Sequence, residues 1–163
     1  MNSDMNIRII CVGKIKESFY REAAAELIKR IGRYADSEII EVAEEKAPEG
    51  LSEAGKQQII DTEGERLLSK IDERDHVIAL CIEGKKLPSV AFSQYIHKMM
   101  LGGKSRIAFV IGGSLGLSRA VTNRAELKLS FSDMTFPHQL FRIMLLEQIY
   151  RAFKIINNEP YHK

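Results

Sequence analysis

Two stretches decide the fold of this 163-residue chain: Phe109-Val-Ile-Gly-Gly-Ser-Leu-Gly-Leu117 and Leu129-Ser-Phe-Ser-Asp-Met-Thr-Phe-Pro-His-Gln-Leu-Phe-Arg142. Each begins as an apolar strand, passes through a loop of Gly, Ser, Asp, Thr or Pro, and then enters a helix. Two such turns bring bare backbone amides and carbonyls together at one edge of a sheet. The pattern predicts a pocket for a flat, polar cofactor that needs few charged side chains.

The rest of the chain alternates strand-like and helix-like segments. Strands are predicted at 7–12, 38–42, 77–82, 106–111 and 126–131, and helices at 16–31, 57–71, 89–101, 118–124 and 138–156. Ser89 is expected to cap its helix, a turn at 83–85 to close the third strand, and residues 44–55 to form an acidic loop. This order predicts one α/β domain with a mostly parallel sheet, helices on both faces, and ligands at the carboxyl ends of the strands.

Composition indicates an ordinary soluble protein, with 45% hydrophobic and 28% charged residues. No apolar run reaches the roughly 18–20 residues that span a bilayer, and Asp4, Arg8 and Lys14 interrupt any signal peptide. A cytoplasmic protein without membrane contact is expected. Cys11 and Cys81 lie in apolar strands without metal-ligand spacing, which predicts buried thiols and no metal.

Charge is unevenly distributed along the chain. The overall net charge is +2, but residues 102–163 carry +5 and residues 1–101 carry −3. The basic part contains both loops described above. This asymmetry indicates that an anionic partner approaches that end of the molecule.

The last predicted helix, 138–156, is apolar over more than half of its circumference. One stripe packs on the sheet, and the remainder requires either another partner or complete burial in the core. A domain of this size encloses such a helix with difficulty, which favours an isologous homodimer interface.

Two familiar phosphate-binding patterns are absent. The run Gly102-Gly103-Lys104-Ser105 has Lys98 where a phosphate loop requires glycine, and it precedes a strand instead of following one. The sequence Gly112-Gly113-Ser114-Leu115-Gly116 does not fit GxGxxG and follows a late strand. A flavodoxin-like nucleotide binder would need its phosphate loop after the first strand, where the chain has only Gly13-Lys14-Ile15-Lys16.

Longer motifs resemble one family. The blocks 109–117, 129–142 and Glu147-Gln-Ile-Tyr-Arg-Ala-Phe-Lys-Ile155, with Tyr161-His162-Lys163 at the end, are similar to the ribosomal RNA large subunit methyltransferase H family of the SPOUT superfamily. Residues 7–16 and Glu45-Lys46-Ala47-Pro48 match as well, so the likeness covers the chain. Residues 1–4 look like an N-terminal extension before Met5.

The resemblance implies a homodimer that binds S-adenosylmethionine in a C-terminal trefoil knot, with residues 105–163 forming the cofactor-binding knot region and the dimer helix. No spacing argument predicts a knot, because knots are rare among folds. The implied methyl acceptor is N3 of a pseudouridine in 23S ribosomal RNA, presented by the assembled ribosome. By position, the cofactor contacts fall at Leu80, Gly112, Phe131, Ser132, Asp133, Met134, Thr135 and Phe136.

Methylation at N3 requires a group that removes the imide proton, for which histidine is suited by its pKa of about 6.5. We expect Tyr161-His162-Lys163 to position the acceptor, with His162 as the base, and Arg142 to hold an anionic group near the methyl donor. His138, beside the cofactor loop, and water are alternative proton acceptors. A SPOUT methyltransferase acting on tRNA and a non-enzymatic ribosome-binding module are the alternative functions.

Overall fold

A parallel sheet forms the centre of the protein. The computed structural model describes residues 5–161, and in this range five strands lie in the order β2-β1-β4-β3-β5, with every neighbouring pair parallel. The predicted α/β class with a parallel sheet is confirmed. The strands are β1 (Asn6–Val12), β2 (Asp36–Val42), β3 (His76–Lys86), β4 (Arg106–Ile111) and β5 (Leu127–Ser130).

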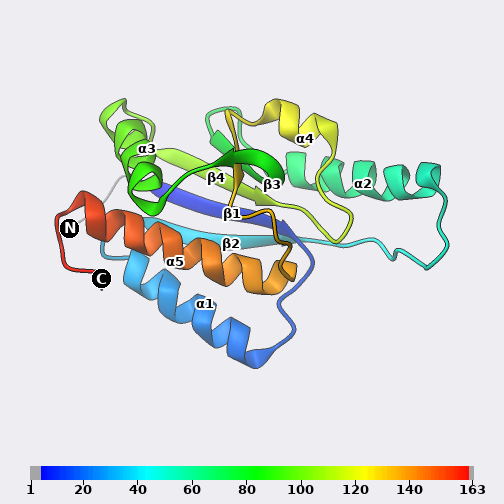
Figure 1. Ribbon diagram of the computed structural model, residues 1–163, viewed down its shortest axis with the longest axis horizontal. Helices are drawn as coiled ribbons and strands as arrows, with labels where there is room; N and C mark the ends of the chain where they lie inside the picture. Colours follow the sequence, from blue (N-terminus) through cyan, green and yellow to red (C-terminus); the bar gives the residue numbers. More distant parts are fainter. Residues whose placement is uncertain (1–4, 162–163) are drawn as a thin grey trace.

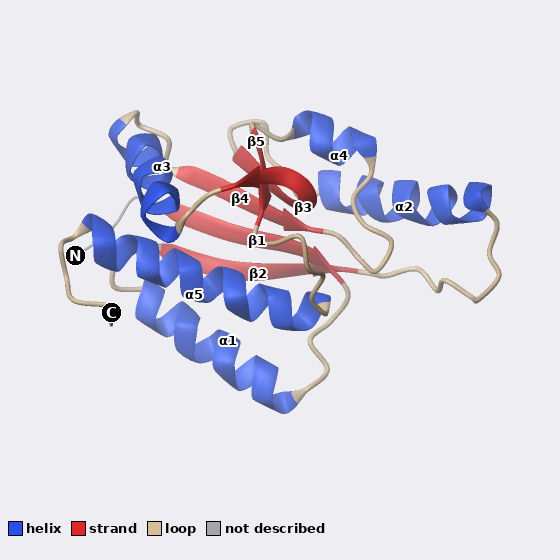
Figure 2. Cartoon of the chain, in the orientation of Figure 1, coloured by secondary structure: helices blue, strands red, loops and turns tan. Residues whose placement is uncertain are grey.

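Helices cover both faces of this sheet (Figures 1 and 2). One face packs against α1 (Ser18–Ile31), α3 (Ser89–Leu101) and α5 (His138–Ile156), and α5 lies between the other two. The opposite face packs against α2 (Glu53–Leu68) and α4 (Arg119–Arg124). The larger core, on the first face, therefore lies between the sheet and the helix that follows the second predicted loop.

The position of β1 inside the sheet, between β2 and β4, explains why its sequence is a continuous apolar run. Ile7 and Ile9 point into the core beneath α1 and α5, whereas Ile10 and Val12 point into the core beneath α2 and α4. All four side chains are fully buried. A parallel strand covered on both faces has no solvent side and so does not alternate between apolar and polar residues.

The third strand differs from the prediction. The prediction that a turn at 83–85 closes this strand is wrong, because β3 continues to Lys86 and curves around β5 (Figure 2). Leu129 of β5 is in register with both Leu80 and Lys85, so the intervening residues form an irregular arc. A Cβ atom on Gly84 would lie 2.7 Å from backbone atoms of Leu129. Glycine at this position therefore permits β3 to pass directly against the backbone of β5.

Two helix starts also differ in detail. Ser52 caps α2 by accepting the N–H of Gly55 at 3.0 Å, so this helix begins four residues before the predicted Gln57. Ser89 is not a cap: Pro88 occupies that position, and the Ser89 hydroxyl donates to Oε1 of Gln148 on α5 at 2.8 Å. The hydroxyl thus joins two helices.

Residues 5–161 hold neither a membrane-spanning helix nor a cluster of metal-binding side chains. No helix in this range is long and apolar enough to cross a membrane, and no group of three or more His, Cys, Asp or Glu side chains in it forms a metal site. Both cysteines are free. Burial raises the pKa of Cys11 to about 12, so its thiol stays protonated and packs as an apolar group.

Candidate functional site

A cavity of about 800 Å³ opens at the carboxyl ends of β3, β4 and β5. Its walls are residues 80–83 in β3, where pairing with β4 ends, 111–117 from the end of β4 onward, 130–132 and 134–138 from the end of β5 onward, and Phe141 on α5. Cavities of about 300–1,000 Å³ are typical of small-molecule sites, and parallel α/β sheets usually carry them at this edge. The two loops singled out in the sequence thus line one cavity.

The residues that the resemblance associates with a cofactor lie around this cavity, with one exception. Asp133 does not line it; its carboxylate instead forms an ion pair with Nζ of Lys86 at 2.6 Å, which links the loop after β5 to the end of β3. Seven of the eight predicted positions line the cavity: Leu80, Gly112, Phe131, Ser132, Met134, Thr135 and Phe136.

The glycine-rich loop after β4 folds tightly onto itself. Gly113 and Gly116 form an isolated bridge, the N–H of Gly116 donates to the carbonyl of Gly113 at 3.1 Å, and Gly116 has a φ of +96°. A Cβ atom on Gly112 would lie 2.8 Å from backbone atoms of Gly116. Gly112 is therefore required by the turn itself, in addition to leaving space for a ligand.

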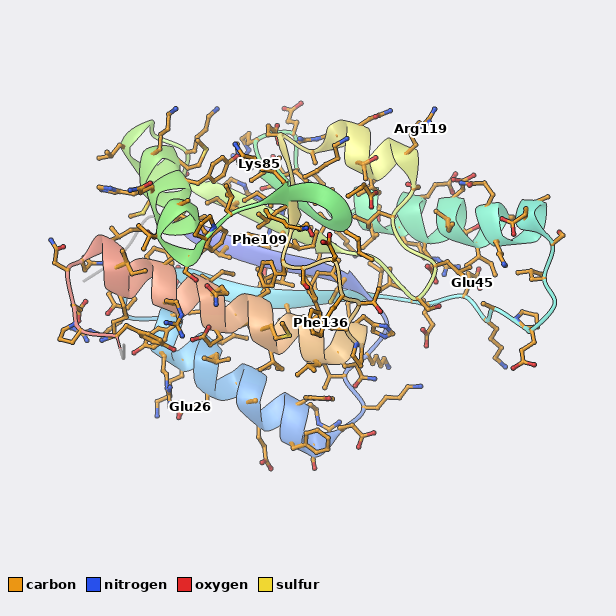
Figure 3. The ribbon with its side chains drawn as sticks, viewed as in Figure 1. Glu26, Glu45, Lys85, Phe109, Arg119 and Phe136 are labelled. Carbon is orange, nitrogen blue, oxygen red and sulfur yellow. The ribbon has the colours of Figure 1, made fainter. Side chains whose placement is uncertain are left out.

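The loop after β5 has an internal frame of serine hydrogen bonds. Ser130 Oγ donates to the Ser132 carbonyl at 3.1 Å, and Ser132 Oγ accepts the N–H of Met134 at 3.0 Å. The ring of Phe131 lies 4.9 Å from that of Phe141 between centroids, and Phe136 lies beside α5 (Figure 3). The loop thus combines ordered polar backbone with an aromatic wall, which is suited to a purine ring.

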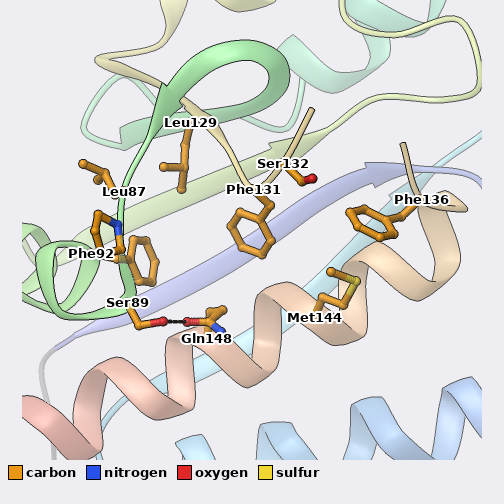
Figure 4. A pocket seen from close by; sticks show the side chains of 10 residues that line it. Leu87, Ser89, Phe92, Leu129, Phe131, Ser132, Phe136, Met144 and Gln148 are labelled. Atoms are coloured by element: carbon orange, nitrogen blue, oxygen red, sulfur yellow. Dashed lines mark hydrogen bonds between the residues drawn. The ribbon is translucent and has the colours of Figure 1, made fainter. Parts of the chain in front are cut away.

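A second cavity of about 310 Å³ shares Phe131, Ser132 and Phe136 with the first. Figure 4 shows the Phe131 ring pointing into it from the loop, opposite Met144 on α5, with the Ser89–Gln148 hydrogen bond at its edge. The sequence did not predict this cavity, because its walls come from α3, β5 and α5 together.

His138 lines the larger cavity at the first turn of α5. Burial lowers its pKa below the ordinary 6.5, and the positive charge of Arg142 adds to the effect against the opposing charge of Glu44. The imidazole is therefore uncharged near neutral pH. A neutral imidazole beside a bound ligand is able to accept a proton.

Arg142 lies outside the cavity lining and is fully buried. Its guanidinium donates to Oε2 of Glu41 at 2.8 Å and to the carbonyls of Val12 and Gly13 at 2.7 and 2.8 Å. These bonds direct the positive charge toward the ends of β1 and β2. Such a position favours a role in holding the start of α5 over a direct contact with an acceptor anion.

Residues 157–161 fold back at the end of α5 opposite His138 (Figure 1). The Tyr161 hydroxyl bonds to Glu147, and its ring packs on Tyr150 and beneath the Arg151 guanidinium. Tyr161 lines neither of the two cavities. The predicted His162 and the neighbouring Lys163 lie outside the described residues.

Glu63 is a buried acid that sequence reasoning missed. It is only 4% exposed on α2, with Oε2 accepting the N–H of Glu45 at 2.9 Å. In the sequence it stands in a polar helix and resembles any solvated glutamate. The available signal was its position one turn before the buried Leu67, on the stripe that faces the sheet.

Comparison with known proteins agrees with this arrangement. A family model described as Predicted SPOUT methyltransferase matches residues 5–162. A solved structure, described as a probable methylase family protein from Haemophilus influenzae Rd KW20, superposes with a TM-score of 0.53 over 99% of this chain and 71% of that chain. Its sequence identity is 15%, so this likeness concerns the fold alone.

Curated relatives are far more similar in sequence. The protein named Ribosomal RNA large subunit methyltransferase H from Bacillus pumilus is 58% identical over 159 residues, which cover 98% of this chain and 100% of the relative. Proteins of the same name from Carboxydothermus hydrogenoformans and Limosilactobacillus reuteri are each 55% identical over the same shares. The chain belongs to the ribosomal RNA large subunit methyltransferase H family of SPOUT methyltransferases.

Proposed function

We propose that this protein methylates N3 of a pseudouridine in 23S ribosomal RNA. S-adenosylmethionine is the methyl donor, and the assembled ribosome is the acceptor substrate. Family membership supports a methyltransferase, and the names of the relatives support large-subunit RNA as the acceptor. The observation that carries the cofactor assignment is the single cavity lined by seven of the eight positions that the resemblance assigns to cofactor binding.

The residues present fit S-adenosylmethionine. Leu80, Phe131 and Phe136 offer apolar surface for an adenine ring, and the backbone of 131–136 offers polar groups to its edge. When bound, the cofactor supplies a methyl group on a sulfonium for in-line displacement. The role of the protein is to hold donor and acceptor in line. The two loops and α5 provide this alignment. The C-terminal trefoil knot of the family is part of this proposal.

The acceptor must lose its imide proton, and two histidines are candidates to receive it. His138 lines the cavity and is neutral near pH 7, so it is available as a base. His162 follows Tyr161, which packs far along α5 from the cavity of its own subunit. We therefore propose that a homodimer brings the tail of one subunit, residues 161–163, to the cavity of the other, where it positions the acceptor.

The surface of α5 supports this dimer. Its inner stripe is buried, and several of its remaining apolar side chains are only partly covered by α1, α3 and the sheet. A partly covered apolar face of this kind suits an isologous contact. Light scattering is expected to give twice the chain mass. The partly buried apolar residues of α5 are Leu140, Phe141, Ile143, Met144, Tyr150, Ile155 and Ile156.

The decisive experiment is nucleoside mass spectrometry of RNA after incubation of protein and S-adenosylmethionine with ribosomes that lack the modification. We expect one methyl group on pseudouridine of 23S RNA, and none when free 23S RNA or tRNA replaces the ribosome. Methylation of tRNA would establish the alternative SPOUT substrate. Absence of methyl transfer to any RNA, together with ribosome binding, would favour a non-enzymatic binding module located with ribosomes in the cytoplasm.

Two variants separate the candidate bases. His162→Ala and His138→Ala are compared for methylation rate and for cofactor affinity by calorimetry. The base is the histidine whose loss eliminates methyl transfer while cofactor affinity is retained. Normal methylation by His162→Ala would remove His162 from the catalytic assignment, and normal methylation by both variants would leave water as the proton acceptor.

A further inference from the structure

Glu63 carries a buried carboxylate with one oxygen unused. Oε2 accepts the N–H of Glu45, whereas Oε1 has no hydrogen-bond partner among the described residues. A buried polar atom in this condition destabilises a folded protein, so its retention requires a reason.

The unused oxygen faces the wall of the larger cavity. A Cβ atom on Gly113 would lie 2.9 Å from Oε1 of Glu63, and Gly113 lines the cavity. Because glycine has no side chain, only the backbone of one residue separates the carboxylate from the space in which a cofactor is proposed to bind. The neighbouring Gly112 is one of the proposed cofactor contacts.

The charged groups around Glu63 do not offset the negative charge that its carboxylate carries when ionised. Glu44 and Glu45, on the loop after β2, add to it, and Glu44 also acts on His138 across the end of β1. Arg66 on α2 is the opposing cation, but its guanidinium is engaged by Oε1 of Glu45 at 2.9 Å. Val12 of β1, which lies beside Gly113 as Glu63 does, carries no titratable side chain.

Burial is the largest cause that raises the pKa of Glu63, and the charge of Glu44 adds to it, while the N–H of Glu45 opposes both. The pKa of this carboxyl is therefore higher in the free protein than that of an exposed glutamate. A cation placed on the other side of Gly113 favours its ionised form, because opposite charges interact strongly where water is excluded.

We propose that Glu63 is a specificity-determining residue that makes the cavity prefer the sulfonium form of the cofactor to the thioether left after methyl transfer. This inference rests on the proposed function. The two molecules differ by one positive charge, so a carboxylate behind the cavity wall attracts the methyl donor and favours release of the product. Binding of the donor then lowers the pKa of Glu63 relative to the free protein, and binding of the product does not.

The test uses isothermal titration calorimetry of the full chain with S-adenosylmethionine and with S-adenosylhomocysteine. Titrations in pairs of buffers with different ionisation enthalpies, between about pH 5 and pH 8, give the number of protons released on binding. For Glu63→Gln we expect the affinity for the donor to fall about tenfold and that for the product to change less than about twofold, with loss of the donor-specific proton release. Glu65→Gln, an exposed acid on the same helix, is the matched control and should change neither.

Other results would overturn the inference. Equal loss of affinity for both ligands would show that Glu63 only supports the loops, and unchanged donor affinity would show that its charge is not felt in the cavity. If Glu63→Gln does not fold, Glu44→Gln takes its place, with a smaller loss of the same selectivity expected and unchanged selectivity as the refuting result. Failure of the wild-type protein to bind either ligand would refute the cofactor assignment itself, and this outcome is distinct from a loss of selectivity.

Discussion

Replacing Arg142 tests whether this residue holds the site together or contacts the substrate. Its guanidinium is fully buried and bonds to the Val12 and Gly13 carbonyls and to Glu41. In Arg142→Ala both carbonyls lose a charged donor, and a cavity replaces a long side chain. In Arg142→Lys the charge is kept, but a single ammonium cannot reproduce the planar fork that reaches two strand ends.

The size of the expected loss in unfolding free energy follows from these contacts. A hydrogen bond to a charged group contributes about 1.5–3 kcal/mol, so loss of the two carbonyl bonds costs about 3–6 kcal/mol. The pair with Glu41 adds less, because that carboxylate is 31% exposed and its charge is screened by solvent. We expect Arg142→Ala to lower the free energy of unfolding by about 4 kcal/mol, and Arg142→Lys by about half as much. Either is a large share of the roughly 5–15 kcal/mol that stabilises a domain.

Urea unfolding followed by circular dichroism, at one fixed protein concentration, measures this loss. Arg30→Ala is the control, since its ion pair with Glu26 lies at the surface and should contribute less than about 1 kcal/mol. Cofactor affinity is measured in parallel. If Arg142→Ala unfolds at the wild-type urea concentration but loses methylation, the positioning role is refuted and a direct contact with substrate is the better explanation.

Three further outcomes are expected. Gly112→Val should eliminate cofactor binding in calorimetry while light scattering shows an unchanged mass, because its Cβ would lie 2.8 Å from the backbone of Gly116. Gly84→Ala should lower the melting temperature by several degrees or prevent folding, since its Cβ would lie 2.7 Å from the backbone of Leu129, which cannot move aside. With His138 as the base, kcat/KM should rise with pH through a value below 6.5, because the lowered pKa leaves the imidazole protonated only in more acidic solution; a flat profile over that range would contradict this assignment.

The parts of the fold set by local pattern were predictable from sequence. The bounds of β4, α3 and α5 coincide with the prediction, because apolar periodicity, Gly102-Gly103 and Pro137 mark them within a few residues of chain. The end of β3 was not predictable from sequence, because Glu83-Gly84-Lys85 has the composition of a turn. What keeps it extended is pairing with Leu129, more than forty residues later, which no local window contains.

The same distinction separates the parts of the site. The two loops are contiguous in sequence, so their lining residues were found, including Gly112 and Phe136. The burial of Arg142 and Glu63 was not predicted, although Arg142 was a candidate site residue, because a charged residue in a helix normally faces solvent. The partner of Arg142, Glu41, is 101 residues away, and only the assembled sheet brings the two together.

These buried charges converge on a strand that supplies no residue to either cavity. The carbonyl of Val12, the last residue of β1, accepts from Arg142 of α5, and its side chain lies beside Gly113 in the loop after β4. Gly13, the next residue, accepts from Arg142 and lies beside His138. The end of β1 therefore helps to position both loops of the site. A change that shifts β1 should alter cofactor binding and proton acceptance together, although no residue of β1 lines either cavity.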